Sequence, residues 1–220
     1  MPKPLVTVAG RPLLVHVLDR LVACGAGELG VVAGFWGPAA AETFGRQWAG
    51  VPLRWTVQGE PEGPARALEL AAEWVTGPFM VMHGDVLYAP DVSLAPVLAR
   101  FQAEAPAAVL LTERRAPDSI TRGAVRVDEE GSVLDLEEYP GPAGRARGRV
   151  AAGFYVCSPE ILRVCRAMEP SPAGEYELPD AFRELVKAGR RVAAVDLEGR
   201  RINVNTPQDR QAAERLLAES

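Results

Sequence analysis

Short apolar runs alternate with helix-like segments through the first part of this chain, and this alternation constrains the fold most strongly. Leu29–Ala33 and Phe79–Met82 have the length and composition of buried strands. Strands separated by helices favour parallel βαβ units, so we predict an α/β fold. A further strand is expected over Leu53–Val57, and helices are expected over Pro12–Ala23, Pro38–Trp48 and Ala65–Val75.

The pattern changes after Ala107, where strand-like runs follow one another without helices between them. These runs are Ala107–Leu111, Ala124–Val127, Val133–Leu136 and Ala151–Val156, with Asp128–Gly131 as a hairpin turn. The remaining elements are helices over Ser158–Met168, Leu178–Ala188 and Pro207–Ala218, with Thr206 as an N-cap, and a strand over Val192–Val195. We therefore predict a Rossmann-like mixed, mostly parallel sheet flanked by helices, with an inserted antiparallel portion, in one domain over residues 1–220.

Composition narrows the classes of function. With 48% hydrophobic and 24% charged residues, the chain can bury a sizeable core. The net charge of −5 and the absence of a basic stripe argue against a nucleic-acid partner. No apolar run approaches the ~20 residues of a membrane span. Three cysteines without metal-ligand spacing are expected to be reduced thiols of a cytoplasmic protein. A homo-oligomer is left open.

Asp85 comes directly after the predicted strand Phe79–Met82. In open α/β sheets ligands bind at the carboxyl ends of strands, and a carboxylate there can hold a divalent cation against phosphate oxygens. The amide oxygen of Asn203 could complete a magnesium site with Asp85. A simple Gly84-Asp85 turn, and a strand end followed by a capped helix after Asn203, account for the same residues without a metal. Spacing alone leaves both interpretations open.

Seven blocks of the sequence resemble those of the sugar-1-phosphate nucleotidyltransferases, in the family's order and across essentially the whole chain. In the first part, Lys3–Leu13 resembles PKPLVPVAGKPL, Gln58–Ala65 resembles Q..PLGTA, and His83–Asp85 resembles NGD. In the second part, Gly123–Pro140 resembles YGVV..D..G.V..I.EKP, Ala152–Val156 resembles NAGIYVF, Gly174–Leu178 resembles GEYELTDA, and Ile202–Pro207 resembles WIDVGTPED.

This resemblance implies a reaction between a nucleoside triphosphate and a sugar 1-phosphate. The sugar-phosphate oxygen attacks the α-phosphorus, and pyrophosphate leaves. Such transfers need positioning and charge neutralisation more than covalent help. The resemblance implies catalytic roles for Lys3 and Asp85, with Mg²⁺ held by Asp85 and Asn203. The implied substrate contacts are Gln58 and Gly63 for the base, and the Gly123 amide and Glu138 for the sugar. Gly84 and Gly153 are implied elsewhere in the site.

The sequence also departs from the family pattern. The family begins with a strand and a glycine-rich loop, LAAGxGTRLRP, which would precede Met1. We therefore expect a sheet without its middle strand and weak catalysis from the chain as given. Tyr139 stands where the family has a lysine, so a cation expected at the sugar phosphate is missing. Arg145, Arg147 and Arg149 could each replace it, and the sequence selects none of them.

Two alternative functions remain. A non-catalytic relative that binds sugar nucleotides for regulation would explain the missing loop and Tyr139. Asn203–Pro207 also resembles a block of the molybdenum-cofactor guanylyltransferases. The hairpin insert and Gly174–Leu178 favour the sugar branch.

Overall fold

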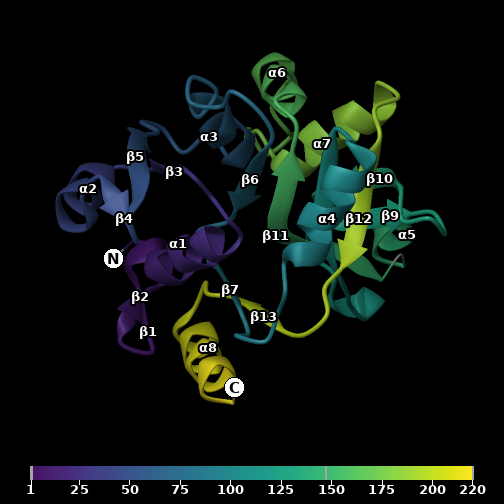
Figure 1. Cartoon of the computed structure of the whole chain (residues 1–220). Helices are drawn as coiled ribbons and strands as arrows, with labels where there is room; N and C mark the ends of the chain where they lie inside the picture. Colours follow the sequence, from purple (N-terminus) through teal and green to yellow (C-terminus); the bar gives the residue numbers. More distant parts are fainter. Residues whose placement is uncertain (1, 147, 220) are drawn as a thin grey trace.

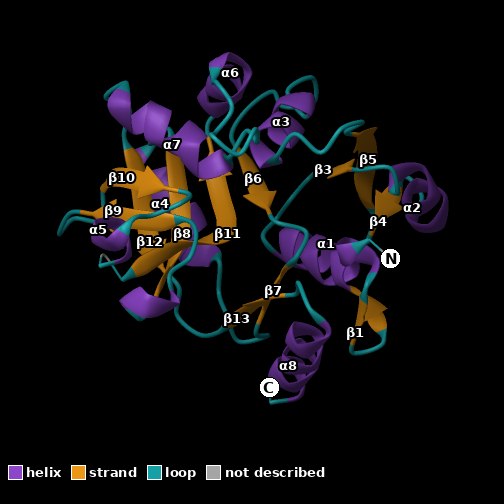
Figure 2. Ribbon diagram, turned by 180° about the vertical axis from the view of Figure 1, so that it is seen from behind, coloured by secondary structure: helices purple, strands orange, loops and turns teal. Residues whose placement is uncertain are grey.

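The computed structural model describes residues 2–146 and 148–219. Helices cover both faces of a six-stranded mixed sheet, and a three-stranded sheet lies beside it (Figures 1 and 2). The helices are α1 (Leu13–Ala23), α2 (Gly37–Phe44), α3 (Pro64–Leu70), α4 (Ala95–Glu104), α5 (Pro142–Arg145), α6 (Glu160–Ala167), α7 (Leu178–Lys187) and α8 (Pro207–Ala218), with short 3-10 turns η1 (Lys3–Leu5) and η2 (Pro117–Ser119). None of these helices has the length and apolar composition that a membrane crossing requires.

The strands are β1 (Thr7–Val8), β2 (Arg11–Pro12), β3 (Leu29–Ala33), β4 (Gln47–Trp48), β5 (Val51–Val57), β6 (Phe79–Met82), β7 (Val86–Tyr88), β8 (Ala108–Arg114), β9 (Ala124–Val127), β10 (Val133–Glu137), β11 (Arg149–Cys157), β12 (Val192–Asp196) and β13 (Arg201–Asn203).

The larger sheet has the strand order β10-β9-β11-β8-β12, and β6 pairs with β11. The smaller sheet has the order β3-β5-β4. β3 runs parallel to β5 and β12 parallel to β8, whereas β11 runs antiparallel to β6 and β8. The predicted mixed α/β fold is confirmed, but the sheet is not mostly parallel: among the described strand pairs, β3–β5 and β8–β12 are parallel and the others are antiparallel.

The core has two main layers because side chains alternate across the larger sheet. Phe154 and Val156 of β11 pack in one buried cluster with residues of α4 and α8. Tyr155 and Cys157 pack on the opposite face with residues of α6 and α7. Burial on both faces explains why these strands appear in the sequence as nearly continuous apolar runs.

Helix α1 joins the two sheets. Leu13 belongs to the main cluster, while Leu14 and Leu18 pack against the smaller sheet. Among the described residues, β3 forms a ladder only with β5, and β6 forms one only with β11. No ladder joins the edges of β3 and β6 within the described residues.

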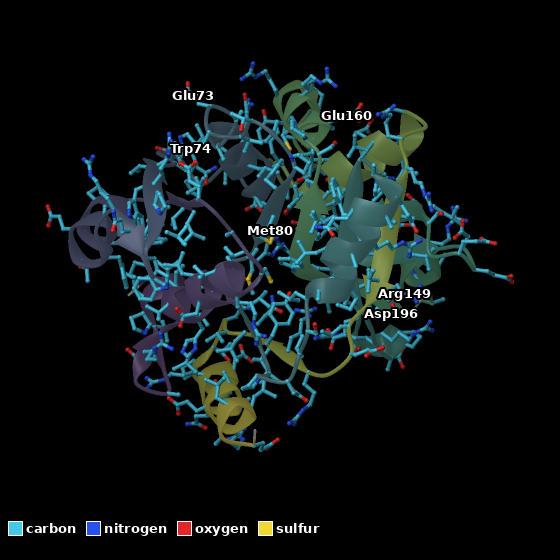
Figure 3. All side chains as sticks on the ribbon, in the orientation of Figure 1. Glu73, Trp74, Met80, Arg149, Glu160 and Asp196 are labelled. Atoms are coloured by element: carbon cyan, nitrogen blue, oxygen red, sulfur yellow. The ribbon has the colours of Figure 1, made fainter. Side chains whose placement is uncertain are left out.

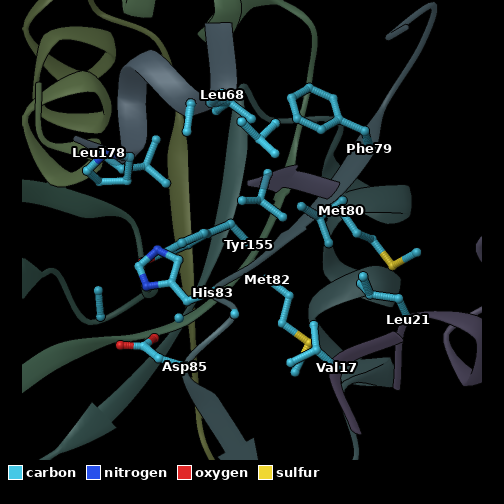
Figure 4. A pocket seen from close by; sticks show the side chains of 18 of the residues that line it. Val17, Leu21, Leu68, Phe79, Met80, Met82, His83, Asp85, Tyr155 and Leu178 are labelled. Carbon is cyan, nitrogen blue, oxygen red and sulfur yellow. The ribbon is translucent and has the colours of Figure 1, made fainter. Parts of the chain in front are cut away.

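A cavity of about 1770 Å³ lies along these edges. Its apolar wall includes Val31 of β3. The same wall includes Val17 and Leu21 of α1, and Met80 and Met82 of β6 (Figure 4). The same cavity continues to polar residues that follow β6, precede β9 and follow β10. It is therefore both a gap in the sheet and the entrance to the candidate site.

The helix predicted over Pro38–Trp48 is too long. It ends at Phe44, because Gly45 takes a left-handed φ of 72° that stops the helix. Ala49 and Gly50, both with positive φ, then form a tight turn that pairs β4 with β5. By contrast, α8 has the predicted bounds, and Thr206 and Asp209 form a capping box at its start.

Candidate functional site

Asp85 lies in the loop that leaves the carboxyl end of β6. The His83 amide donates to the Gly153 carbonyl at 2.9 Å, and the Asp85 carbonyl accepts from the Val204 amide at 2.8 Å. Gly153 has a φ of 84°, and a Cβ there would lie 2.8 Å from Val86 Cγ2. Glycine is therefore required for β11 to approach this loop so closely. Backbone bonds from two sides hold Asp85 at the edge of the sheet.

Asn203 lies beside this loop because β13 pairs antiparallel with β7, with Asn203 opposite Val86. Asp85 and Asn203 both line the cavity. The Oδ1 atom of Asn203 accepts a hydrogen bond from the Arg201 guanidinium, which leaves one lone pair on that oxygen.

The described residues contain no cluster of three or more His, Cys, Asp or Glu side chains arranged to hold a metal. Mg²⁺ commonly binds one or two protein carboxylates and completes its octahedron with water and substrate phosphates. One carboxylate and one amide oxygen fit that limited role.

Arg201 is a residue of this site that the sequence analysis did not select. Its side chain is 5% exposed and lies 3.0 Å from Glu113 Oε2. It also donates to the Ala151 carbonyl at 3.3 Å. In the sequence, Arg201 is only a charged residue two positions before Asn203. Its burial depends on contact with β11. Arg201 places a fixed positive charge beside the proposed metal ligands.

His83 is packed between Tyr155 and Asp85 (Figure 4). Its ring lies edge-on to Tyr155, with the ring centroids 5.5 Å apart, and its Nε2 atom is buried without a partner. Burial lowers the pKa of His83, and the charge of Arg201 lowers it further, while Asp85 opposes both effects. A neutral imidazole results, in keeping with a side chain that lines the site without adding charge.

The Lys3 segment meets the same loop. Lys3 Nζ donates to Asn205 Oδ1 at 2.8 Å, although the two residues are 202 positions apart. Pro4 Cγ lies 3.5 Å from the place that a Cβ on Gly84 would occupy. The structure therefore brings Lys3, Gly84 and Asp85 together with the β13–α8 connection.

The predicted base-binding turn is held by a distant segment. Gln58 Nε2 donates to the Gly63 carbonyl at 3.3 Å. Gly63 has a φ of 104°, and a Cβ there would lie 2.7 Å from the Tyr176 carbonyl oxygen. The Tyr176 amide donates to the Glu62 carbonyl at 2.8 Å, and the Ala65 amide donates to the Tyr176 carbonyl at 2.9 Å. Gln58 and Gly63 do not line the large cavity.

The predicted sugar contacts lie at the open end of the β9–β10 hairpin, opposite its turn: Gly123 precedes β9 and Glu138 follows β10. Glu138 is 8% exposed. Burial and the neighbouring Glu177 carboxylate raise the pKa of Glu138 to about 7, although Arg122 opposes the shift. The implied role of the Gly123 amide needs a correction, because this amide already donates to the Glu138 carbonyl at 3.0 Å. The absent side chain of Gly123 instead keeps space open beside the carboxylate, since a Cβ there would lie 3.8 Å from Glu138 Oε2.

Three neighbours of Glu138 were not selected from the sequence as site residues. Glu177 is 4% exposed and accepts a hydrogen bond from Tyr139 Oη at 3.2 Å. Arg122 Nη2 donates to the same hydroxyl at 2.8 Å, and Arg122 Nη1 lies 3.5 Å from Glu138 Oε1. Glu177 belongs to the Gly174–Leu178 block, which was its only sequence signal.

Two of the three candidate replacements for the missing lysine, Arg145 and Arg149, are bound to other groups of the protein. Arg149 Nη2 lies 2.7 Å from Asp196 Oδ2 (Figure 3). Both residues line a second, smaller cavity of about 530 Å³. Arg145 donates to the Pro140 carbonyl at 3.2 Å. Arg147 lies outside the described residues.

The large cavity thus brings most of the predicted site residues to one space. Acidic and amide groups lie where β6 and β13 end, and buried carboxylates lie at the β9–β10 hairpin. The predicted residues that line it are Lys3, Gly84, Asp85, Gly123, Glu138, Gly153 and Asn203.

Comparison with known proteins agrees with this fold. The sequence profile of the family described as Nucleotidyl transferase matches residues 1–207. The chain is 32% identical over 219 residues to the UTP–glucose-1-phosphate uridylyltransferase AglF of Haloferax volcanii, covering 99% of this chain and 88% of that protein. It is 29% identical over 221 residues to a glucose-1-phosphate thymidylyltransferase of Streptomyces griseus, covering 99% of this chain and 61% of that protein.

A solved structure of UDP-glucose pyrophosphorylase complexed with UDP-glucose superimposes with a TM-score of 0.88 at 18% identity, covering 98% of this chain and 89% of that one. At 18% identity, this similarity shows only that the two proteins share a fold. The chain belongs to the nucleotidyl transferase family.

Proposed function

We propose that this protein is a sugar-1-phosphate nucleotidyltransferase and that residues 1–220 act as one catalytic domain. A nucleoside triphosphate and a sugar 1-phosphate react to give a nucleoside-diphosphate sugar and pyrophosphate. The observation that carries the proposal is the single cavity lined at one end by Asp85 and Asn203 and at the other by Glu138. One end suits phosphates and a cation, and the other suits sugar hydroxyls.

On this proposal Asp85 and Asn203 supply oxygen ligands to Mg²⁺, which neutralises phosphate charge when it is bound. Lys3 approaches the same phosphates, since it lies beside Gly84 and Asn205. Arg201, whose charge is paired with Glu113, holds the Asn203 side chain in place. Such preorganised groups stabilise charge that develops on the leaving pyrophosphate.

Substrate choice is proposed from the relatives. AglF is named for UTP and glucose 1-phosphate, and the Streptomyces griseus enzyme for thymidylyl transfer to glucose 1-phosphate. We propose a uridine or thymidine triphosphate and glucose 1-phosphate as first substrates to test. Gln58 and Gly63 would contact the base, and Glu138 would accept hydrogen bonds from sugar hydroxyls. A cytoplasmic location is proposed from the three free cysteines.

A binding-only relative is the second candidate. The observation in its favour is that Asn203 is an amide whose oxygen already accepts from Arg201, which weakens the metal site. This protein would bind nucleotide sugar without turnover.

One experiment separates the two candidates. Pyrophosphate release is measured with each common nucleoside triphosphate against several sugar 1-phosphates, with Mg²⁺ and with EDTA. Thermal shift with the same compounds and with UDP-glucose reports binding, because a ligand of the native state raises the melting temperature. Magnesium-dependent pyrophosphate release supports the enzyme. Stabilisation by UDP-glucose without turnover favours the binding-only relative, and neither response would contradict both.

A further inference from the structure

Arg122 and Tyr139 form a stacked pair at the end of the β9–β10 hairpin. The Cζ atom of Arg122 lies 4.8 Å from the centroid of the Tyr139 ring. Arg122 Nη2 also donates to the Tyr139 hydroxyl at 2.8 Å. That hydroxyl donates to Glu177 Oε1 at 3.2 Å. The planar guanidinium is therefore oriented by the ring, and the ring is anchored by a buried carboxylate.

Arg122 remains accessible although it is held in this way. Its side chain is 58% exposed, while the Glu138 side chain beside it is 10% exposed. A guanidinium carries five N–H donors. Arg122 Nη2 donates to Tyr139, and Nη1 faces Glu138 Oε1 at 3.5 Å and Glu177 Oε1 at 4.0 Å, which are ion-pair distances at or beyond the limit of a direct hydrogen bond. The remaining donors can bind an oxyanion next to the carboxylate that is proposed to hold sugar hydroxyls.

The other cations of the cavity are occupied elsewhere. In the described part of the chain its basic side chains are Lys3, Arg115, Arg122 and Arg201. Lys3 is bonded to Asn205 at the far end, beside Gly84. Arg115 and Arg201 both pair with Glu113, at 2.9 Å and 3.0 Å. Arg122 is paired as well, with Glu138 at 3.5 Å and Glu177 at 4.0 Å, and these partners place its charge at the proposed sugar site.

The family block that matches this hairpin also has one aromatic and one cationic residue at the positions of Arg122 and Tyr139. In YGVV..D..G.V..I.EKP a tyrosine precedes the glycine and a lysine follows the glutamate. Here Arg122 precedes Gly123 and Tyr139 follows Glu138, so the aromatic and the cationic residue have exchanged places. The two positions lie at the same end of the hairpin, because Ala124 and Glu137 are opposite each other in the β9–β10 ladder.

From these observations we infer that Arg122 binds the phosphate group of the sugar 1-phosphate and that Tyr139 is its positioning residue. This inference rests on the proposed function. A guanidinium binds phosphate through two parallel N–H donors, and stacking on a ring limits the orientations that it can adopt. Glu138 would then bind the hydroxyls of the sugar 1-phosphate, and Arg122 would bind its phosphate from the same side.

The test compares five variants with the wild type: Arg122→Ala, Arg122→Lys, Tyr139→Lys, the exchange pair Arg122→Tyr with Tyr139→Lys, and Arg163→Ala as a control. Arg163 is 81% exposed on α6 and away from the cavity. Arg122→Ala is expected to raise the KM for glucose 1-phosphate at least about tenfold, with little change in the KM for the nucleoside triphosphate. The exchange pair is expected to recover most of this loss, unlike Tyr139→Lys alone.

A KM for glucose 1-phosphate that is equal in Arg122→Ala and Arg163→Ala would overturn the inference while leaving the proposed function intact. An equal rise in both KM values would also overturn it, because that pattern indicates general damage. If the wild type shows no turnover, calorimetry with glucose 1-phosphate replaces the KM. Binding lost only in Arg122→Ala then supports the inference, binding retained in it overturns it, and no binding to the wild type contradicts both proposals.

Discussion

The Arg201 guanidinium donates a hydrogen bond to Oδ1 of Asn203, one of the two side chains proposed to hold Mg²⁺. The proposed ligands are thus one carboxylate, Asp85, and one amide, where two carboxylates would bind a metal more strongly. The charge of the Asp85–Asn203 pair alone is −1, and Arg201 offsets part of its field. Metal affinity is therefore the property of this site most open to change by substitution.

We expect Asn203→Asp to lower the Mg²⁺ concentration that gives half-maximal pyrophosphate release by about tenfold, equivalent to ~1.4 kcal/mol. The added carboxylate is a better ligand for a hard cation and also pairs with Arg201. Gln211→Asp is the matched control, since it adds the same charge on an exposed position of α8. Equal magnesium requirements in the two variants would count against the metal site.

Asp85→Ala should remove magnesium-dependent turnover, with a loss of at least ~10²–10³ in rate, the usual effect of deleting one preorganised group. If the protein only binds, magnesium-dependent nucleotide binding should be lost instead. Asp118→Ala, an exposed carboxylate in η2, serves as the control. A folded Asp85→Ala protein with normal magnesium dependence would show that the metal lies elsewhere.

Glu138→Ala should weaken the binding of glucose 1-phosphate or UDP-glucose, measured by calorimetry. At pH 8, where Glu138 with its pKa of about 7 is mostly ionised, the expected loss is ~1.5–3 kcal/mol, because hydroxyl donors lose a charged acceptor. The affinity for the nucleoside triphosphate alone should stay the same. Identical sugar-phosphate affinity in wild type and variant would exclude Glu138 from the sugar site.

The raised pKa of Glu138 predicts a pH dependence of stability. Its pKa is about 7 in the folded protein, against an ordinary value of 4.5, so the folded state keeps a proton that the unfolded state has released between these values. The stabilising contribution is complete below about pH 4.5 and disappears as the pH rises through 7. Its upper bound is about 3 kcal/mol.

Denaturant unfolding at pH 5 and pH 8 measures this contribution. Glu138→Gln should show a smaller loss of stability between the two pH values than the wild type, since it cannot ionise. The remaining pH dependence belongs to groups such as Glu177 and Asp180, whose pKa values are also raised by burial. Equal pH dependence in both proteins would contradict the assignment to Glu138.

The open edge of β6 makes a prediction for hydrogen exchange. The His83–Gly153 bond identifies a hydrogen-bonded pair of the antiparallel ladder, and such pairs alternate. The amides of Phe79 and Val81 therefore point to β11, and those of Met80 and Met82 point into the cavity. We expect Met80 and Met82 to exchange much faster than Phe79 and Val81. Strong protection of Met80 and Met82 would show that a further strand covers this edge in solution.

Local pattern was enough for the elements that position Asp85. Phe79–Met82 was predicted with its observed bounds because its apolar side chains are needed on both sides of a covered sheet, and α8 because Thr206 and Pro207 specify its start. These signals act between residues close in sequence or on one face of one element. They could place Asp85 at a strand end, but they could not place Arg201 or Glu177 in the site.

What only the tertiary structure decided are contacts between residues far apart in the chain. Arg122 and Tyr139 are 17 positions apart, and Tyr139 and Glu177 are 38 apart, so no local period relates them. The sequence by itself determined the alternation of elements, the family blocks and the carboxylate after β6. Packing decided which arginine faces Glu138, because burial and pairing depend on which elements the folded chain brings together.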